Sequence, residues 1–332
     1  MKPGVFAGTR AALVSRGVIV ASALLAGCLG VASESRAPFD VATPGTWATL
    51  APMPTARQEV AAAALDGRVF VIGGFGENAD PVAVVEAYDP ATDRWETRAP
   101  LPAPTHHAAA AVVGGRLFVV GGFTGGRLNW TAQADVYEYD PARNVWVSRA
   151  PLPTPRGALA VAPVGDRLHA VGGNAGGLTP AHEVYDPATN RWLSAPPLRI
   201  PRDHLAATAV GGRLWAIGGR RSFVGEQYDN VDVYDPATEL WTSGAPLPAA
   251  RGGLAAATLA ERVFVFGGEA PLRIFGTADM YDPIARQWIG KTPMPTPRHG
   301  IGAVPLNGRI YVPGGGIRPG FAHSNVNEVY QP

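Results

Sequence analysis

Six Gly-Gly doublets divide this chain of 332 residues into units of nearly constant length. A tryptophan lies 26 residues before the first glycine of each doublet, and in five units a Tyr-Asp-Pro motif places its tyrosine 7 residues before the next tryptophan. Only the segment from the second glycine to the tyrosine varies, between 12 and 17 residues. A unit of this period must bury its apolar face against its neighbours. The sequence therefore predicts one array of six units, each displaying one variable loop.

Within each unit the pattern predicts four antiparallel strands. In the third unit an apolar stretch, 157–164, precedes the Gly-Asp pair at 165–166, which is typical of a tight hairpin turn. A second strand then ends at the doublet. After the variable loop, a third strand ends at the Tyr-Asp-Pro of 185–187, where Asp-Pro marks a turn, and a fourth carries Trp192. This is a meander of the size of a propeller blade.

The doublets with their spaced tyrosines and tryptophans resemble the kelch repeat, over residues 47–332. The resemblance implies an all-β fold, a six-bladed β-propeller spanning 46–332. Trp47 has no tyrosine unit before it, and the chain reaches Tyr330 without a seventh tryptophan. We therefore expect the amino-terminal strand to join the last blade and close the ring, which removes a free sheet edge. The recurrent aromatic residues are interpreted as packing between blades.

The amino terminus reads as a targeting segment. Residues 1–27 combine three basic residues with an apolar stretch too short to span a membrane comfortably. Leu-Ala-Gly-Cys at 25–28 resembles the lipobox of bacterial lipoproteins, which implies cleavage before Cys28 and lipidation of its thiol. Residues 28–45 would be the lipid-anchored spacer. We expect an exported lipoprotein anchored in the bacterial cell envelope, in the periplasm or at the cell surface; the alternative is an ordinary signal peptide with a chance cysteine.

Charge and cysteine content exclude some classes. Removing residues 1–27 takes away three basic residues and no acidic one, so the net charge of +1 falls to about −2 and gives no case for nucleic acid binding. Cys28 is the only cysteine, so no internal disulfide is expected. A closed ring leaves no edge in need of a partner, and a monomer is expected. No cofactor is expected either.

Each strand crosses the propeller once, so the variable loops lie on the same face as the segments that open the first strand of each unit. We call this face the loop face. Five units open with an arginine, and the second has Thr105 instead. In several kelch substrate adaptors, arginines near this position line the central pocket, and a ring of guanidinium groups would suit carboxylates. The alternative is internal pairing with the acids two residues before each tyrosine. The arginines are Arg57, Arg156, Arg202, Arg251 and Arg298, and the acids are Glu86, Glu183, Asp232, Asp279 and Glu328.

Two residues after the opening position, alternation would return a side chain to the same side of the strand. Glu59, His107 and His204 stand there and could be drawn as a metal site of two histidines and a carboxylate. They belong to units one, two and four, however, so no clustering and no metal site are expected. A polar lining for a sugar or peptide pocket is the alternative.

The variable loops add further candidate ligand-binding residues. Trp130 lies outside the repeat register, and a tryptophan near arginine is typical of binding hot spots and sugar stacking; a loop folded over its own blade is the alternative. The other loop candidates are Arg220, Glu269 and Arg318.

Two functions remain in contention. No catalytic signature such as Gly-x-Ser-x-Gly or His-Glu-x-x-His is present, which favours a non-catalytic protein that presents the loop face to a protein or glycan. The alternative is an envelope enzyme similar in architecture to the six-bladed sialic-acid mutarotases, with Glu59, His107, His204 and Arg202 as acid-base and substrate-holding residues. A copper oxidase like galactose oxidase is excluded, because its tyrosine–cysteine cross-link needs a cysteine in the propeller.

Overall fold

The computed structural model describes Met1, Gly4, Gly8 and residues 41–127, 129–222 and 224–332. Almost all of the expected signal segment, Cys28 and most of the proposed spacer lie outside the described residues. The chain divides into two units, Met1–Pro38 and Phe39–Pro332. Among the described residues, none of the helices has the length and apolar character needed to cross a membrane.

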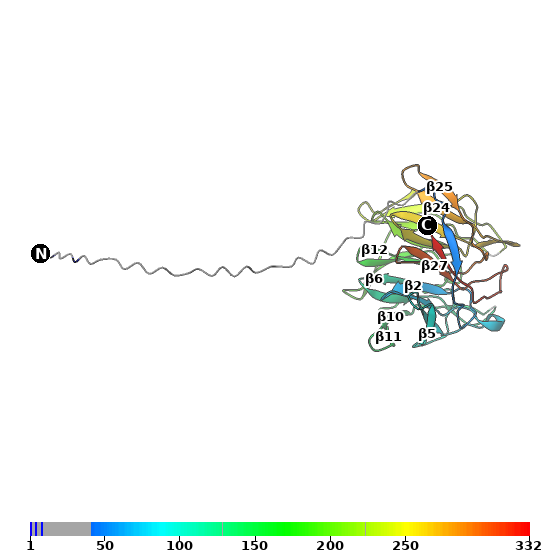
Figure 1. Ribbon diagram of the computed structural model, residues 1–332, viewed down its shortest axis with the longest axis horizontal. Coiled ribbons are helices and arrows are strands. Elements are labelled where there is room, and N and C mark those ends of the chain that lie inside the picture. Colours follow the sequence, from blue (N-terminus) through cyan, green and yellow to red (C-terminus); the bar gives the residue numbers. More distant parts are fainter. Residues whose placement is uncertain (2–3, 5–7, 9–40, 128, 223) are drawn as a thin grey trace, which may run out of the picture. The chain divides into compact units, whose positions relative to one another are not determined.

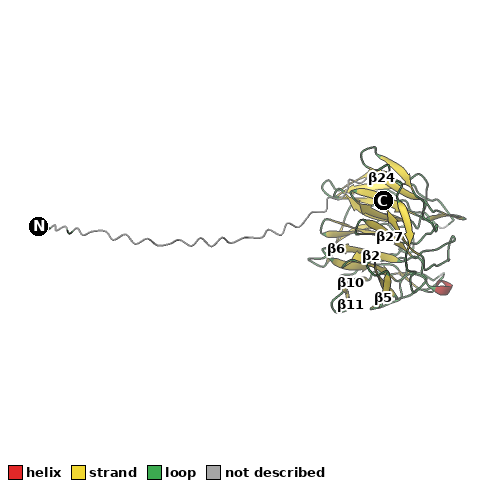
Figure 2. Ribbon diagram, in the orientation of Figure 1, coloured by secondary structure: helices red, strands yellow, loops and turns green. Residues whose placement is uncertain are grey.

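The second unit consists of six four-stranded antiparallel sheets, one for each sequence repeat, with almost no helix (Figures 1 and 2). Blades one to three contain β2 (Ala61–Leu65), β3 (Arg68–Ile72), β4 (Val85–Asp89) and β5 (Arg94–Arg98); β6 (Ala109–Val113), β7 (Arg116–Val120), β10 (Val136–Asp140) and β11 (Val145–Ser148); and β12 (Ala160–Val164), β13 (Arg167–Val171), β14 (His182–Asp186) and β15 (Arg191–Ser194). Blades four to six contain β16 (Ala206–Val210), β17 (Arg213–Ile217), β18 (Val231–Asp235) and β19 (Leu240–Ser243); β20 (Ala255–Leu259), β21 (Arg262–Phe266), β24 (Ala278–Asp282) and β25 (Gln287–Lys291); and β26 (Val304–Leu306), β27 (Arg309–Pro313), β28 (Asn327–Gln331) and β1 (Thr46–Thr49).

Three of the variable loops carry short elements of their own. The first contains the 3-10 turn η1 (Glu77–Ala79), the red element of Figure 2. The second contains the hairpin β8 (Phe123–Thr124) and β9 (Thr131–Ala132), and the fifth the hairpin β22 (Glu269–Ala270) and β23 (Arg273–Ile274).

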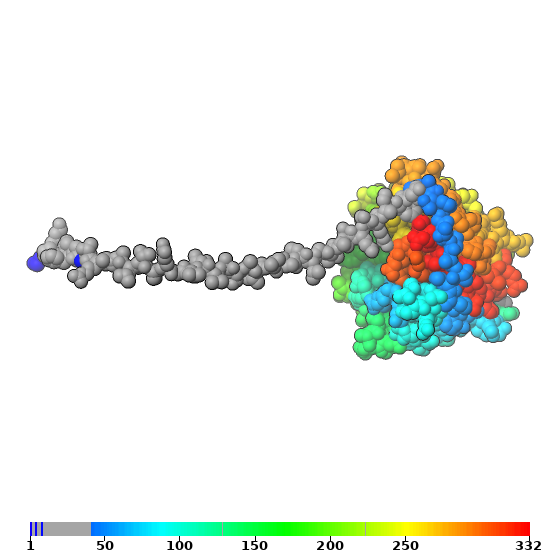
Figure 3. Space-filling view, in the orientation of Figure 1, coloured from blue at the N-terminus to red at the C-terminus, as the bar shows by residue number. Residues whose placement is uncertain are grey.

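The ring closes as predicted. Strand β1 pairs antiparallel with β28, with Trp47 opposite Tyr330. In the space-filling view, the blue segment that contains β1 lies against the red carboxy-terminal strand (Figure 3). The last blade is therefore built from both ends of the propeller, and β28 pairs with β1 instead of being left as an edge strand.

The aromatic residues of the repeat join neighbouring blades. Each tryptophan ring packs on a tyrosine of its own blade, as Trp192 does on Tyr185 at 5.1 Å between ring centroids. The indole N–H then donates to a carbonyl oxygen beside the neighbouring blade, as Trp192 Nε1 does to Ala150 O at 2.9 Å. Because the same bond recurs from Trp95, Trp146, Trp241 and Trp288, these residues are structural and form no aromatic ligand cage.

Candidate functional site

The opening arginines do not form a ligand-binding ring. All five side chains are 0% exposed, and each pairs with the acid of its own blade. Arg57, for example, donates to the Glu86 carboxylate at 2.7 Å and to the carbonyl of Gly73, in the doublet, at 2.9 Å. The guanidinium groups thus satisfy buried acceptors at the doublet turn, and internal pairing is the interpretation that the structure supports. The prediction that Arg57, Arg156, Arg202, Arg251 and Arg298 bind ligand is therefore corrected.

Two residues further on, the six blades meet in what we call the central ring: Glu59, His107, Ala158, His204, Gly253 and Gly300. Each backbone N–H donates to the carbonyl of the ring residue in the neighbouring blade, at 2.8–3.2 Å, and the circuit closes from Glu59 N to Gly300 O. All six residues have φ between 51° and 63°, in the left-handed region. Such a conformation costs energy for residues other than glycine, so the circuit of hydrogen bonds has to stabilise it.

Three side chains occupy the axis of the central ring, because the other positions are alanine or glycine. One ligating atom each from Glu59, His107 and His204 lies within 4.8 Å of the other two. The expectation that these residues would not cluster was wrong. Blades one, two and four are not all adjacent, but the innermost strands of all blades converge on one axis. Close to the axis, side chains from non-adjacent blades therefore also meet.

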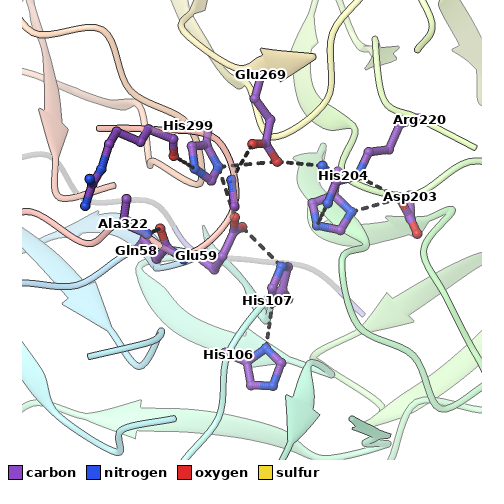
Figure 4. A network of polar contacts seen from close by, with 12 residues as sticks. Gln58, Glu59, His106, His107, Asp203, His204, Arg220, Glu269, His299 and Ala322 are labelled. Carbon is purple, nitrogen blue, oxygen red and sulfur yellow. Dashed lines mark hydrogen bonds and ion pairs between the residues drawn. The ribbon is translucent and has the colours of Figure 1, made fainter. Parts of the chain in front are cut away.

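A second set of polar side chains, which the sequence interpretation missed, surrounds these three (Figure 4). They are His106, Asp203 and His299, and each directly follows the opening position of its blade. The residue after each of them has a left-handed φ, which breaks the strand alternation from which side-chain directions were predicted. Each forms a β-bridge with the residue that follows a doublet, and one of these bridges, Asp203 to Arg220, brings a predicted residue into the cluster. Their constant place in the repeat, one residue after the opening position, is the sequence signal that could have identified them.

Hydrogen bonds orient both histidines of the central ring. His204 Nδ1 lies 2.8 Å from Asp203 Oδ1, so this nitrogen carries the proton, and Nε2 accepts from Arg220 Nη2 at 2.7 Å. Arg220 also pairs with Glu269 Oε1 at 2.6 Å. The predicted residues Arg220 and Glu269 therefore do reach the axis, but as partners of one another and of His204. We call Glu59, His106, His107, Asp203, His204, Arg220, Glu269 and His299 the axial cluster.

His106 and His107 share a proton between their Nδ1 atoms, which are 2.6 Å apart. His106 Nε2 faces the Gly125 carbonyl at 3.0 Å and must donate to it. Burial lowers the pKa of His106 to about 4, which keeps this ring neutral at neutral pH, so its Nδ1 accepts and that of His107 donates. His107 Nε2 lies 3.3 Å from Glu59 Oε2.

The other titratable groups are tuned by their neighbours. Burial by itself raises the pKa of the Glu59 carboxyl, but His107, His299 and His204 outweigh it and hold this pKa well below its usual range. Burial lowers the pKa of His107 well below its ordinary value. Burial also opposes the charge on His299, yet Glu59 and Glu269, at 3.3 and 3.6 Å from Nδ1, raise its pKa overall. Such a concentration of perturbed groups in one place is typical of functional sites.

A channel of about 460 Å³ begins at the central ring and follows the six inner strands. Half of the residues that line it are alanine, as in 61–64, 109–111 and 255–257. Glu59, His107 and His204 line its ring end, while its other end is lined by the last residues of the inner strands, before the hairpin turns. Small wall residues leave space for a ligand that bulkier side chains would fill.

On the loop face, aromatic residues cover the axial cluster. The Trp130 ring lies 4.9 Å from the His107 ring and 5.9 Å from that of Phe75, with 37% of its surface exposed. Phe321, 48% exposed, packs on the same Phe75 at 5.6 Å. Trp130 therefore packs over His106, His107 and Phe123 of its own blade, and lies beside Phe75 of blade one. Arg318 is exposed on the sixth loop, and its carbonyl accepts from His299 Nε2 at 3.0 Å.

Comparisons with known proteins agree with this architecture. The family described as "KLHDC2/KLHL20/DRC7 Kelch-repeats domain" matches residues 39–199, and the Kelch motif matches 201–248 and 250–295. Kelch-like protein 35 of Mus musculus is 32% identical over 128 residues, which are 39% of this chain and 21% of that protein. The chain thus matches only about a fifth of the length of that relative.

A solved structure, that of YjhT, superimposes with a TM-score of 0.72 over 84% of this chain and 96% of that one. The identity is 18%, so the likeness shows the fold. Together with the six blades and the closed ring, these matches lead to one conclusion: the chain contains kelch repeats that fold as a six-bladed β-propeller.

Proposed function

We propose that this protein is a non-catalytic binding protein whose loop face engages a protein partner. Kelch propellers fit a protein-interaction role. The observation that carries the proposal is the pair Trp130 and Phe321, both exposed and both supported by the buried Phe75 ring. Aromatic side chains held rigidly at the centre of a face are typical binding hot spots.

Further apolar side chains are exposed in other variable loops. Of the large apolar residues exposed in the described part of the chain, three more lie in variable loops: Val224, Leu272 and Ile317. They belong to the fourth, fifth and sixth loops, so the apolar surface is spread over several blades. A broad surface of this kind suits a protein rather than a single sugar ring.

The experiment compares capture of proteins from the cell envelope by the wild type and by the double variant Trp130→Ala/Phe321→Ala. Leu240→Ala is the matched control, because Leu240 is 62% exposed but begins the outer strand β19. We expect a partner retained by the wild type and the control and lost by the double variant. Equal retention by all three proteins would contradict the proposal, and retention of glycans alone on an array would replace the protein partner by a sugar.

We further propose that the protein is exported and anchored through lipid on Cys28. The proposal rests on the sequence at 25–28 and on the basic and apolar segment before it. Metabolic labelling with an alkyne-bearing fatty acid is expected to mark the wild type and not Cys28→Ser. Unlabelled protein that fractionates with soluble proteins would contradict the anchor.

A second function, a carbohydrate-active enzyme of the mutarotase kind, is favoured by one observation. The channel of about 460 Å³ has the size of a small-molecule pocket and ends at Glu59, His107 and His204, a carboxylate and two imidazoles suited to moving protons. Arg202 has no part in it, since its side chain is 0% exposed and paired with Asp232. The test is anomer exchange of sialic acid followed by NMR, with Glu59→Gln beside the wild type; equal rates with and without protein would remove this candidate.

A further inference from the structure

We propose that Glu59, His107 and His204 bind a divalent first-row transition metal ion on the propeller axis. Two imidazole nitrogens and one carboxylate oxygen form a donor set suited to Zn²⁺ or Fe²⁺. One such atom from each residue already lies within 4.8 Å of the others, on a backbone circuit that fixes the three positions relative to one another. The proposal is independent of the loop-face partner, which depends on other side chains.

The first argument is the orientation of the imidazoles. A histidine that binds metal through one ring nitrogen usually donates the other N–H to a fixed acceptor, which sets the tautomer. Here His204 Nδ1 is held by the Asp203 carboxylate at 2.8 Å, and His107 Nδ1 is held by His106 Nδ1 at 2.6 Å. In both rings Nδ1 is thus engaged by a fixed neighbour, and Nε2 is the nitrogen that a metal ion would bind. Asp203 and His106 would act as positioning residues.

The second argument is the close approach of two ligating atoms. His107 Nε2 and Glu59 Oε2 are 3.3 Å apart in a site where the two side chains are 4% and 10% exposed. Two polar atoms this close and this buried need a proton or a cation between them. A metal ion bound to both atoms would meet that need.

The third argument is charge. The axial cluster contains three carboxylates, those of Glu59, Asp203 and Glu269, against the Arg220 guanidinium and the His299 imidazole. Three carboxylates against one guanidinium make this buried cluster rich in anionic groups, which favours binding of a cation. His299 Nδ1 makes no hydrogen bond of good geometry, although it points at Glu59 and Glu269.

Arg220 competes with the ion. Its Nη2 donates to His204 Nε2 at 2.7 Å, so the ion takes this lone pair only if Arg220 withdraws from it. Arg220 keeps Glu269 and Asp203 as partners when it does. Metal binding and acid-base use of Glu59 exclude each other, because the same oxygen lone pairs serve both. The three protein ligands leave coordination positions for water or for a ligand in the channel.

The experiment is a calorimetric titration of the full-length chain with ZnCl₂, after chelator treatment and in a Cys28→Ser background, so that the only thiol contributes nothing. We expect one saturable site. Glu59→Gln should weaken binding at least about tenfold, whereas His323→Gln, on the sixth loop outside the axial cluster, should leave it unchanged. Arg220→Met should strengthen binding, because it removes the competitor for His204 Nε2.

The outcomes separate cleanly. Absence of saturable Zn²⁺ binding by the wild type overturns the proposal, as does equal affinity of Glu59→Gln and wild type. His107→Gln replaces Glu59→Gln if the latter does not fold. The visible spectrum of Co²⁺ added to the wild type needs no variant: intense bands of a four- or five-coordinate ion support the site, and the weak spectrum of the hydrated ion contradicts it.

Discussion

The backbone N–H of His107 donates to the carbonyl oxygen of Glu59 at 3.2 Å, while its Nε2 lies 3.3 Å from the carboxylate of the same residue. Main chain and side chain thus join blade one to blade two at the axis. The same main-chain bond recurs around the central ring, so the fold positions the candidate site directly. No loop has to order for the three ligating side chains to meet.

Gly300→Ala tests how closely the site depends on this ring. A Cβ at Gly300 would lie 2.6 Å from Glu59 Cδ, whereas a Cβ at Gly253 would meet nothing nearer than 3.4 Å. Both glycines have left-handed φ, at 58° and 63°, so both substitutions carry a penalty of about 1 kcal/mol. Only Gly300→Ala also displaces the Glu59 carboxylate, and we expect the larger fall in unfolding free energy and the loss of Zn²⁺ binding there. Equal behaviour of Gly300→Ala and Gly253→Ala in denaturant titration and calorimetry would contradict this.

The blades, the ring closure and the loop face were predictable because the repeat encodes each of them locally. The spacing from tryptophan to doublet predicts four strands per unit. The strand at Trp47 has no partner in a unit of its own, so it can pair only with the last blade, as it does. The acid partners of the opening arginines were also found in the sequence, but burial decides between pairing and ligand binding, and burial is a property of the packed blade. Arg57 and Glu86 illustrate this, with side chains 0% and 2% exposed.

The axial cluster was not predictable in the same way. Alternation along a strand predicts that residues 58 and 59 point to opposite sides, but the left-handed φ of 53° at Glu59 brings both toward the axis. Nothing in one repeat reveals that conformation, because the stabilising hydrogen bonds come from the next blade. Convergence of Glu59, His107 and His204 likewise follows only from closure of the whole ring.

Arg57→Met is expected to act on stability rather than on binding. It would leave the Glu86 carboxylate buried without its partner, and breaking a buried ion pair from one side costs about 3–5 kcal/mol. Arg68→Met is the control, since Arg68 and Glu96 are 33% and 52% exposed and an exposed pair contributes about 1 kcal/mol or less. Chemical denaturation measures both. A loss at Arg57 as small as that at Arg68 would show that the pairing does not stabilise the blade.

From the buried pair His169 and His182 we predict that acid destabilises blade three. His169 Nδ1 and His182 Nε2 are 2.9 Å apart, packed against Tyr234 and near Arg167 and Arg156, and burial lowers their pKa values to about 3 and about 4. In the unfolded chain both histidines have a pKa near 6.5. As pH falls from about 6.5 to about 4, the unfolded state therefore binds protons that the folded state does not bind. Stability should fall by about 1.4 kcal/mol per pH unit for each group. The double variant His169→Leu/His182→Leu should flatten this slope in denaturation at several pH values; an unchanged slope would assign the effect to other groups.

Asn190 tests the contact between blades two and three at the outer strands. Its Oδ1 accepts from Tyr185 Oη at 2.7 Å and from the backbone N–H of Ala150 at 2.8 Å, and its φ is 54°. Asn190→Ala removes both hydrogen bonds, leaves the Ala150 N–H without its partner and puts alanine in the left-handed region, so we expect a loss of about 1–3 kcal/mol of unfolding free energy. The chain itself supplies the control, because blade one uses Asp93 for the same two bonds, to Tyr88 and Ala51. Asn190→Asp should therefore remain close to the wild type in thermal denaturation, and a loss equal to that of alanine would mean that the side-chain acceptor is not what holds the two blades together.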